Sequence, residues 1–371
     1  MGRIGSTFTA VVLTCSVLFL VAGISMNILW RRSFFYDGIR AIKAYQEEAE
    51  SPIMTTFHNI LSKLYGSATF MLVIFAVYFS RHNKMPVLIF LLYFYTKNYI
   101  VYTMKMAFMD PRPFWSTTTV KQLEWGCPDQ FGNPSGHSSS MFLFAMLVYD
   151  VVLRRDSPVL FILASLLGLT VPISRLYLGA HSTNQVLLGM LIELTCLVLY
   201  RYKLQAVLYN ISNNLIRRKN IGQLFLILFG YALALFFPYL VYQLRAQNPT
   251  GQPFIGNMLI GCPHSKTRTG LQMLTKTFEV SGFVGLVFGV LLALYLSKRE
   301  NYRYLYGQWR YIVPGFLSTV ARVLLESIPA LIAYWIFSKY LPHHLTNAYL
   351  RFFSATFGMF LTGFLPVYFG R

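Results

Sequence analysis

Residues 132–149 read GNPSGHSSSMFLFAMLVY, a short polar stretch that runs directly into an apolar one. The apolar part has the composition of a helix buried in lipid, and similar runs recur along almost the whole chain. A mainly apolar run of about 17 to 25 residues can cross the hydrocarbon core of a bilayer, which is about 30 Å thick. The 371-residue chain is 55% hydrophobic and only 12% charged, with a mean hydropathy of +0.50. We therefore predict an all-α, polytopic membrane helix bundle.

The apolar runs predict about ten transmembrane helices. They lie at residues 8–30, 62–80, 86–104, 137–153, 158–178, 184–200, 222–244, 279–297, 312–338 and 348–368. We interpret residues 1–200 as a membrane core and residues 201–371 as additional C-terminal transmembrane helices.

The net charge of +19 would suggest a nucleic-acid ligand in a soluble protein. Here the basic residues lie in short loops between spans, so the positive-inside rule explains them and we expect no nucleic-acid partner. The loops rich in lysine and arginine are predicted to share one side with both termini, at residues 81–85, 154–157, 201–221 and 298–311. That side is predicted to be cytoplasmic, which places the 132–137 loop in a lumen or outside the cell. The endoplasmic reticulum is the default membrane for this arrangement.

Polar side chains interrupt the apolar sequence at three places on the non-cytoplasmic side. The first is KMAFMDPRPFW, residues 105–115, where Lys105 closes a span and Arg112 lies between two prolines. Proline disfavours helix at and before its own position, so Arg112 is expected in an extended segment. Taken alone, a lysine and an arginine at a membrane interface are usually structural.

The second place is the opening stretch, where Ser135 and Gly136 precede a helix expected to begin at about His137. The free backbone N–H groups at a helix N-terminus form an anion site, although a serine there is most often only a cap. The third is SRLYLGAHSTNQV, residues 174–186, where Arg175 ends one span and His181 begins the next.

Together the three places would surround two imidazoles with fixed positive charge and a helix N-terminus. Phosphoryl transfer requires such a site, because its transition state spreads negative charge over three equatorial oxygens. The sequence shows no acidic metal-binding cluster among these motifs. The cations would therefore be side chains, and we expect no metal and no other cofactor.

The motifs K-x6-RP, PSGH and SR-x5-H, in this order, resemble the signature of the type 2 phosphatidic acid phosphatase superfamily. That superfamily includes lipid phosphate phosphatases, isoprenoid and dolichyl diphosphatases, glucose-6-phosphatase and the vanadium haloperoxidases. The resemblance covers about residues 62–200 and implies a six-helix phosphatase-type core. It implies that His181 is the nucleophile that forms a phosphohistidine, and that His137 protonates the leaving oxygen and then activates water. The implied phosphate-binding residues are Lys105, Arg112, Ser135, Gly136 and Arg175.

One position departs from the pattern. Many members of the superfamily have an aspartate four residues after the nucleophilic histidine, and this chain has Gln185. A residue at i+4 shares a helix face with residue i, so the Gln185 amide is expected to reach His181 and to accept its Nδ1 proton without contributing charge. Glucose-6-phosphatase and dolichyl diphosphatase sequences look similar here, so we include Gln185 among the catalytic residues.

Two of the four cysteines, Cys127 and Cys262, lie in loops on the same non-cytoplasmic side, where disulfides persist. The sequence leaves open a bridge between them or two free thiols. A bridge would tie the additional helices to the mouth of the site.

The substrate stays open at this level. The superfamily implies a phosphorylated lipid or small molecule, and a phosphatidate-like lipid comes first because a site at the bilayer surface can receive it sideways. A glucose-6-phosphatase-like sugar phosphatase is the second reading, since this chain extends well beyond six spans, and a dolichyl or isoprenoid diphosphatase is the third. In another class of protein, Gln185 would mark an inactive scaffold or lipid-binding subunit. Membrane lipids are expected contacts in every case, and the sequence indicates no particular protein partner.

Overall fold

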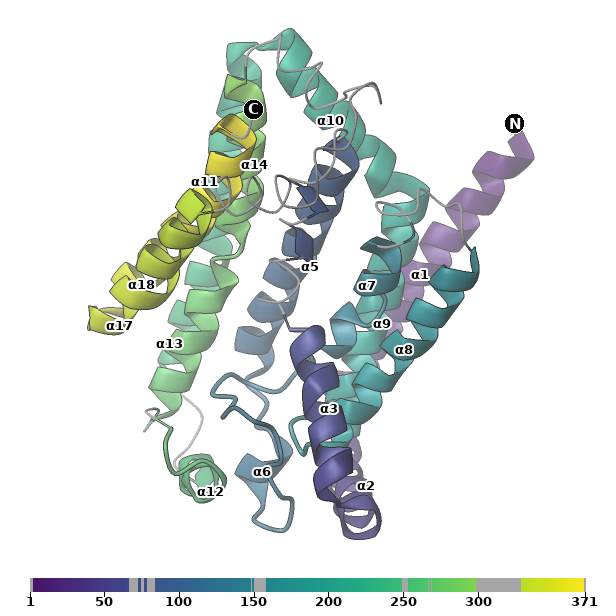
Figure 1. Cartoon of the computed structure of the whole chain (residues 1–371), viewed down its shortest axis with the longest axis vertical. Coiled ribbons are helices and arrows are strands. Elements are labelled where there is room, and N and C mark those ends of the chain that lie inside the picture. The colour runs from purple at the N-terminus through teal and green to yellow at the C-terminus, as the bar shows by residue number, and fades with distance from the viewer. Residues whose placement is uncertain are drawn as a thin grey trace, which may run out of the picture. The chain divides into compact units, whose positions relative to one another are not determined.

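The structure of the protein is a computed structural model, which describes residues 3–66, 73–74, 77–78, 84–147, 149, 158–248, 253–265, 267, 269–297 and 328–369. Every regular element in these ranges is a helix, and no strand occurs among them, which confirms the predicted all-α fold (Figure 1). The longer helices are α1 (Arg3–Leu29), α2 (Arg31–Ala49), α3 (Pro52–Leu64), α5 (Met85–Phe108), α8 (Pro158–Tyr177), α9 (Thr183–Leu199), α10 (Gln205–Arg218), α11 (Ile221–Ala246), α12 (Pro253–Gly261), α13 (Gly270–Ser281), α14 (Val284–Leu296) and α18 (Ala348–Phe369). The short ones are α6 (Pro113–Ser116), η1 (Ser138–Ser140), α7 (Leu143–Met146), η3 (Tyr200–Leu204), η4 (Tyr334–Tyr340) and α17 (Leu341–His344).

Seven helical stretches in the described ranges are long and apolar enough to cross a membrane, so the chain is a multi-pass membrane protein. They are Thr9–Leu29, Met85–Ser116, Val159–Tyr177, Thr183–Arg218, Ile221–Ala246, Gly270–Leu296 and Ala348–Tyr368, and each overlaps a predicted span. The other three predicted spans, 62–80, 137–153 and 312–338, lie partly outside the described residues. The total of about ten spans therefore stays a prediction.

The chain divides into two compact units that both interleave distant segments. The first combines residues 1–69, 101–203 and 241–277, and the second combines residues 70–100, 204–240 and 278–371. The division into a membrane core at residues 1–200 and additional helices at residues 201–371 stays a prediction. The motifs singled out above all lie in the first unit.

The first unit is built around α9, which packs against α1, α2 and η1, while α8 packs against α3 and α7. Helix α3 begins where Ser51 caps it, because the Ser51 hydroxyl accepts the Met54 N–H at 3.2 Å and Pro52 supplies a helical φ at the first position. Glycine allows α9 to approach η1 closely, since a Cβ at Gly189 would lie 2.5 Å from the Ser135 carbonyl oxygen. These contacts fix the ends of α8 and α9 against the 132–140 segment.

The second unit is dominated by the packing of α14 on α18. Gly285 and Gly289 face the α18 backbone, where a Cβ would lie 2.1 Å and 2.2 Å from carbonyl oxygens. Small residues four apart permit this kind of close helix–helix contact in membranes. No motif of the predicted site lies in this unit.

Candidate active site

The predicted site residues come from the ends of α5, α8 and α9 and from the segments that connect them. Lys105 lies in the last turn of α5, and Arg112 has the predicted extended backbone, with φ −82° and ψ 158°, just before α6. Arg175 lies in the last turn of α8, and His181 lies in the turn that leads into α9. The side chains of these four residues are buried, with exposed fractions of 4% or less. Burying several cationic side chains close together is costly, so this arrangement is typical of a site that binds an anion.

The His181 ring is held in a defined orientation by two contacts. Its Nδ1 lies 2.8 Å from the Gly132 carbonyl oxygen, and its Nε2 lies 3.1 Å from Arg112 Nη1. A carbonyl oxygen can only accept a hydrogen bond, so Nδ1 carries the proton and Nε2 carries the lone pair. Arg112 donates towards that lone pair. Nε2 is therefore the nitrogen available for a nucleophilic attack.

A glycine-dependent turn brings His181 to this position. Gly179 has φ +68°, in the left-handed region, and a Cβ there would lie 2.3 Å from the Lys121 carbonyl oxygen. The N–H groups of Ala180 and His181 both donate to the Arg175 carbonyl oxygen at 3.2 Å, which closes the end of α8. The turn thus sets the spacing between Arg175 and His181 through the backbone.

The expectation that Gln185 accepts the Nδ1 proton of His181 is wrong. The Gln185 amide nitrogen donates to the Pro111 carbonyl oxygen at 2.7 Å, and its oxygen accepts the Ser182 N–H at 3.3 Å in a capping box at the start of α9. The Gly132 carbonyl takes the acceptor role instead. The i+4 rule failed because His181 precedes the helix, whose first residue is Thr183.

Gln185 still shapes the site through Gly132. A Cβ at Gly132 would lie only 2.5 to 2.7 Å from the Gln185 amide atoms, so the amide packs directly against the Gly132 backbone. The Gly132 N–H donates to the Asp110 carbonyl oxygen at 2.8 Å. The acceptor for His181 is therefore fixed from two sides. Sequence reasoning did not select Gly132, since a loop glycine has no side chain to suggest a role.

Lys105 and Arg112 are held by backbone carbonyl groups. Lys105 Nζ donates to the Phe131 carbonyl oxygen at 2.9 Å. Arg112 donates from Nε to the Gln130 carbonyl oxygen at 2.8 Å and from Nη1 to the Ala180 carbonyl oxygen at 2.9 Å. Neutral carbonyl dipoles orient the two cations without cancelling their charge. Both remain able to stabilise a phosphoryl group.

The Pro134–Ser140 segment differs from the prediction in its helix start. The chain forms a turn at Gly136 and His137, then the 3₁₀ helix η1, instead of an α-helix that begins at His137. The Ser135 hydroxyl accepts from the Ser138 N–H at 3.3 Å and from the Ser138 hydroxyl at 2.9 Å, so it acts as a cap. Capping uses lone pairs of Ser135 and leaves its hydroxyl proton available. A Cβ at Gly136 would meet nothing within 4 Å, which leaves open space beside this backbone.

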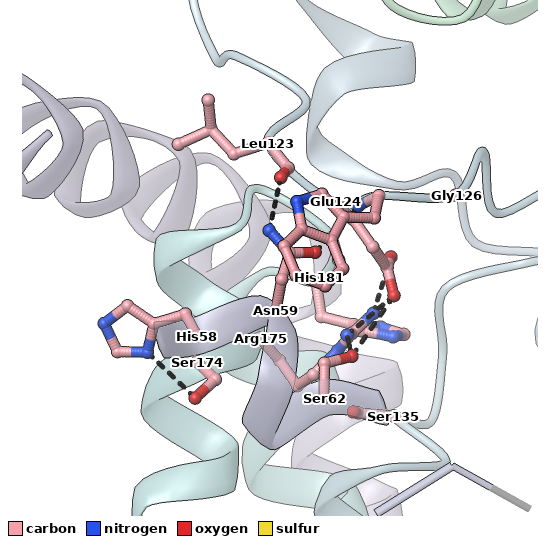
Figure 2. Close-up of polar contacts among 12 residues, drawn as sticks. His58, Asn59, Ser62, Leu123, Glu124, Gly126, Ser135, Ser174, Arg175 and His181 are labelled. Carbon is pink, nitrogen blue, oxygen red and sulfur yellow. Dashed lines mark hydrogen bonds and ion pairs between the residues drawn. The ribbon is translucent and has the colours of Figure 1, made fainter. Parts of the chain in front are cut away.

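An acidic residue that the sequence analysis did not select also belongs to the site. Glu124 forms two hydrogen bonds with Arg175, from Nη1 to Oε1 and from Nη2 to Oε2, each 2.9 Å long (Figure 2). Ser62, on α3, accepts a further bond from Arg175 Nη1 and donates to Glu124 at 3.3 Å. Glu124 and Asp129 both lie between Arg112 and His137, and no pattern in the sequence favours one over the other.

Burial and the neighbouring cations together set the protonation states of the ionisable residues in the site. Burial, and then the positive charge of Arg112, holds the pKa of His181 well below its ordinary value. Burial and the charge of Arg175 lower the pKa of His137 to about 3. Burial alone would raise the pKa of Glu124, but its ion pair with Arg175 outweighs that effect and lowers it to about 2. Both imidazoles are therefore neutral near pH 7 in the ligand-free site. A bound phosphoryl dianion would favour their protonation.

The described residues contain no group of three or more histidine, cysteine, aspartate or glutamate side chains that could hold a metal ion.

Cys127 and Cys262 form a disulfide within the first unit, which resolves the choice that the sequence left open. The bridge links the 117–136 loop to the segment that follows α12.

Comparisons with known proteins identify one family. Residues 86–209 match the PAP2 superfamily, and this range contains all three motifs. No curated protein and no solved structure gave a match to the chain.

Proposed function

We propose that this chain, which belongs to the PAP2 superfamily, hydrolyses a phosphate ester in the membrane without a metal ion and through a phosphohistidine on His181. The family match supports the assignment of the chain as a phosphoric ester hydrolase. The mechanism, the residue roles and the substrate below are our proposal.

The observation that carries the mechanism is the orientation of His181. Because Nδ1 donates to the Gly132 carbonyl oxygen, the lone pair lies on Nε2, and it would attack phosphorus once Arg112 Nη1 turns from Nε2 to the phosphoryl oxygens. The N–P bond forms as the P–O bond to the leaving group breaks. Lys105, Arg112 and Arg175 would stabilise the three equatorial oxygens, with the Ser135 hydroxyl and the Gly136 N–H as further donors.

His137 would supply and recover the proton. The phosphoryl dianion raises its proton affinity, so a protonated His137 can give its proton to the departing alkoxide. In the second half of the reaction, neutral His137 takes a proton from water as the water oxygen attacks phosphorus. The N–P bond breaks, inorganic phosphate forms, and His181 returns to its starting tautomer.

Two of the three substrate classes each have an observation in their favour. A lipid phosphate such as phosphatidate would reach a site at helix ends sideways from the bilayer, and α3, which contributes Ser62, exposes an apolar face. That face consists of Ile53, Phe57, Ile60 and Leu64. A soluble sugar phosphate such as glucose 6-phosphate is favoured by the polar 121–130 segment, which supplies Glu124 and Gln130 to the site.

The positive-inside pattern supports a site that faces a lumen or the exterior, with both termini cytoplasmic and the endoplasmic reticulum as the first membrane to test. An inactive scaffold is disfavoured, because Gln185, the residue that suggested it, has a structural role in the capping box.

The deciding experiment measures phosphate release by the purified protein in detergent, with a chelator and no added metal. The substrates are phosphatidate, sphingosine phosphate, dolichyl diphosphate and glucose 6-phosphate. His181→Ala is compared with His264→Ala, which removes an exposed histidine. We expect activity in the wild type and in His264→Ala, and none in His181→Ala. A labelled, acid-labile phosphoenzyme should form from the best substrate only when His181 is present. Activity that survives in His181→Ala, or that requires a metal, would refute the mechanism.

A further inference from the structure

The Glu124–Arg175 pair occupies only part of the guanidinium. Glu124 binds Nη1 and Nη2, which form the end of the planar group. Nε of Arg175 is buried and has no hydrogen-bond partner within the part of the chain that the structure describes. By covalent geometry, Nε–H and the second N–H of Nη2 share the adjacent edge of the same plane. That edge matches the spacing of two phosphoryl oxygens.

A buried donor without a partner is costly, and such groups in native proteins usually have a functional explanation. Arg175 lies among the cations of the proposed site, since its charge acts on both His137 and His181. A bound phosphoryl oxygen would satisfy Nε–H. The ion pair would then fix the guanidinium in the plane in which its open edge meets the ligand.

The segment that carries Glu124 is itself fixed by two amide side chains. Gln46, on α2, donates to the Lys121 carbonyl oxygen at 3.0 Å and accepts the Lys121 N–H at 2.9 Å. Asn59, on α3, donates to the Leu123 carbonyl oxygen at 2.9 Å (Figure 2). The Asn59 side-chain oxygen accepts the Trp125 N–H at 2.7 Å.

These paired bonds hold the backbone on both sides of Glu124. Its carboxylate therefore has little freedom to follow a moving arginine. The Ser62 hydroxyl accepts a hydrogen bond from Arg175 and donates one to Glu124. These two bonds further restrict the geometry of the ion pair.

We propose that Glu124 is a positioning residue that aligns Arg175, so that the Nε edge of Arg175 binds the phosphoryl group in the transition state. This inference rests on the proposed phosphatase function and adds a residue to its site. Glu124 does not touch the substrate, and it acts through Arg175. Its negative charge also offsets one of the three cations, so that the pocket does not retain inorganic phosphate through excess positive charge.

The test uses the full-length protein with five variants. Glu124→Gln removes the charge at nearly constant shape, and Glu124→Asp keeps the charge on a shorter side chain. Arg175→Lys keeps a cation but has no second edge, and the double variant Arg175→Lys/Glu124→Gln completes a mutant cycle. The matched control, Glu50→Gln, removes a solvent-exposed ion pair with Lys121 from the same loop.

Two readouts are needed. The first is kcat and KM on the substrate that the wild type hydrolyses best. The second is the affinity for orthophosphate and for orthovanadate, measured from the rise in unfolding temperature with anion concentration. Orthovanadate adopts the five-coordinate geometry of the transition state, whereas orthophosphate resembles the product. Their affinity ratio therefore reports alignment separately from overall charge or stability.

We expect Glu124→Gln to lower kcat by about tenfold, which is less than the roughly 10²–10³-fold lost when a transition-state donor is removed, because Arg175 is still present. The vanadate-to-phosphate affinity ratio should fall by about the same factor. In Glu124→Asp, both kcat and this ratio should fall by a smaller factor. In the Arg175→Lys background, Glu124→Gln should change kcat less than about threefold, because the aligned edge is already gone. Glu50→Gln should match the wild type.

The inference is overturned if Glu124→Gln lowers kcat by the same factor in both backgrounds. It is equally overturned if only the unfolding temperature changes while the anion ratio stays at the wild-type value, since Glu124 would then be purely structural. If the wild type hydrolyses no substrate, the proposed function fails. The anion ratio still decides the role of Glu124 in that case, and failure of the wild type to bind either anion rejects it.

Discussion

Replacing Gly132 with alanine tests whether its carbonyl group orients the nucleophile. A Cβ at this position would lie 2.5 Å from Gln185 Oε1 and 2.6 Å from Nε2. Such distances are too short, so either the amide or the 132 backbone must move. The amide is held by the Pro111 carbonyl oxygen and the Ser182 N–H, which makes it a poor candidate to move. We therefore expect the Gly132 carbonyl to shift away from His181.

The size of the effect follows from the bond that is lost. The Nδ1–H of His181 donates to Gly132 over 2.8 Å, and the ring becomes positively charged as Nε2 attacks phosphorus. A hydrogen bond to a charged group contributes about 1.5–3 kcal/mol. Each 1.36 kcal/mol corresponds to a factor of ten in rate, so kcat should fall about 10- to 150-fold. KM should change little, because the phosphate-binding cations do not depend on this bond.

The assay is phosphate release under saturating substrate, with kcat and KM determined separately. Gly256→Ala is the matched control, since a Cβ there would meet nothing within 4 Å. The double variant Gly132→Ala/Gln185→Ala removes the clashing amide and should recover several-fold of the lost rate. A Gly132→Ala protein that is folded and has kcat within threefold of the wild type would refute this account of His181.

Three further predictions concern the disulfide, pH and Gln185. Cys127→Ser removes the bridge to Cys262, which closes a loop with a sequence separation of 135. Chain-entropy estimates give a disulfide that closes such a loop about 4–5 kcal/mol of stabilisation, so the unfolding temperature of the variant should fall. An unchanged unfolding temperature would contradict the bridge. His137 and His181 have pKa values below the unfolded value of about 6.5, so the unfolded state binds protons first and ligand-free stability should decline as pH drops from about 6.5. Unfolding scans from pH 8 to 5 check this, and a flat profile would count against it. Gln185→Asp would place an acceptor against a carbonyl oxygen, so kcat should not rise above the wild-type value.

The apolar runs predicted the membrane helices because hydropathy is a local property of the sequence, and an apolar segment in the bilayer must satisfy its backbone hydrogen bonds as a helix. Among the described residues, every helix long and apolar enough to span overlaps a predicted run. The start of the helix after His137 could not be predicted in the same way. Three serines follow this histidine, and their hydroxyl groups bond the Ser135 and Gly136 oxygens, which favours a 3₁₀ turn over an α-helical one.

The motifs predicted Lys105, Arg112 and Arg175 as one group, because each has a fixed place relative to a helix end. Glu124 could not be predicted from the sequence, because its position does not depend on a nearby helix end. Its partner is 51 residues away, and its position depends on two amides from α2 and α3 that bind the loop backbone. Such contacts leave no local pattern in the sequence.

The change of acceptor at His181 has a chemical consequence. An aspartate paired with Nδ1 would stabilise the imidazolium by a full charge, whereas the Gly132 carbonyl offers only a dipole. In the proposed mechanism, the histidine would then be less basic and more easily displaced from phosphorus once phosphorylated, which would assist the second half of the reaction. Its attack in the first half depends more on the surrounding cations, and Arg112 lies 3.1 Å from the attacking nitrogen. In the proposed mechanism, the charge that stabilises the first step would thus come from the cations on the Nε2 side of the ring, and the Gly132 carbonyl group on the Nδ1 side would hold the tautomer.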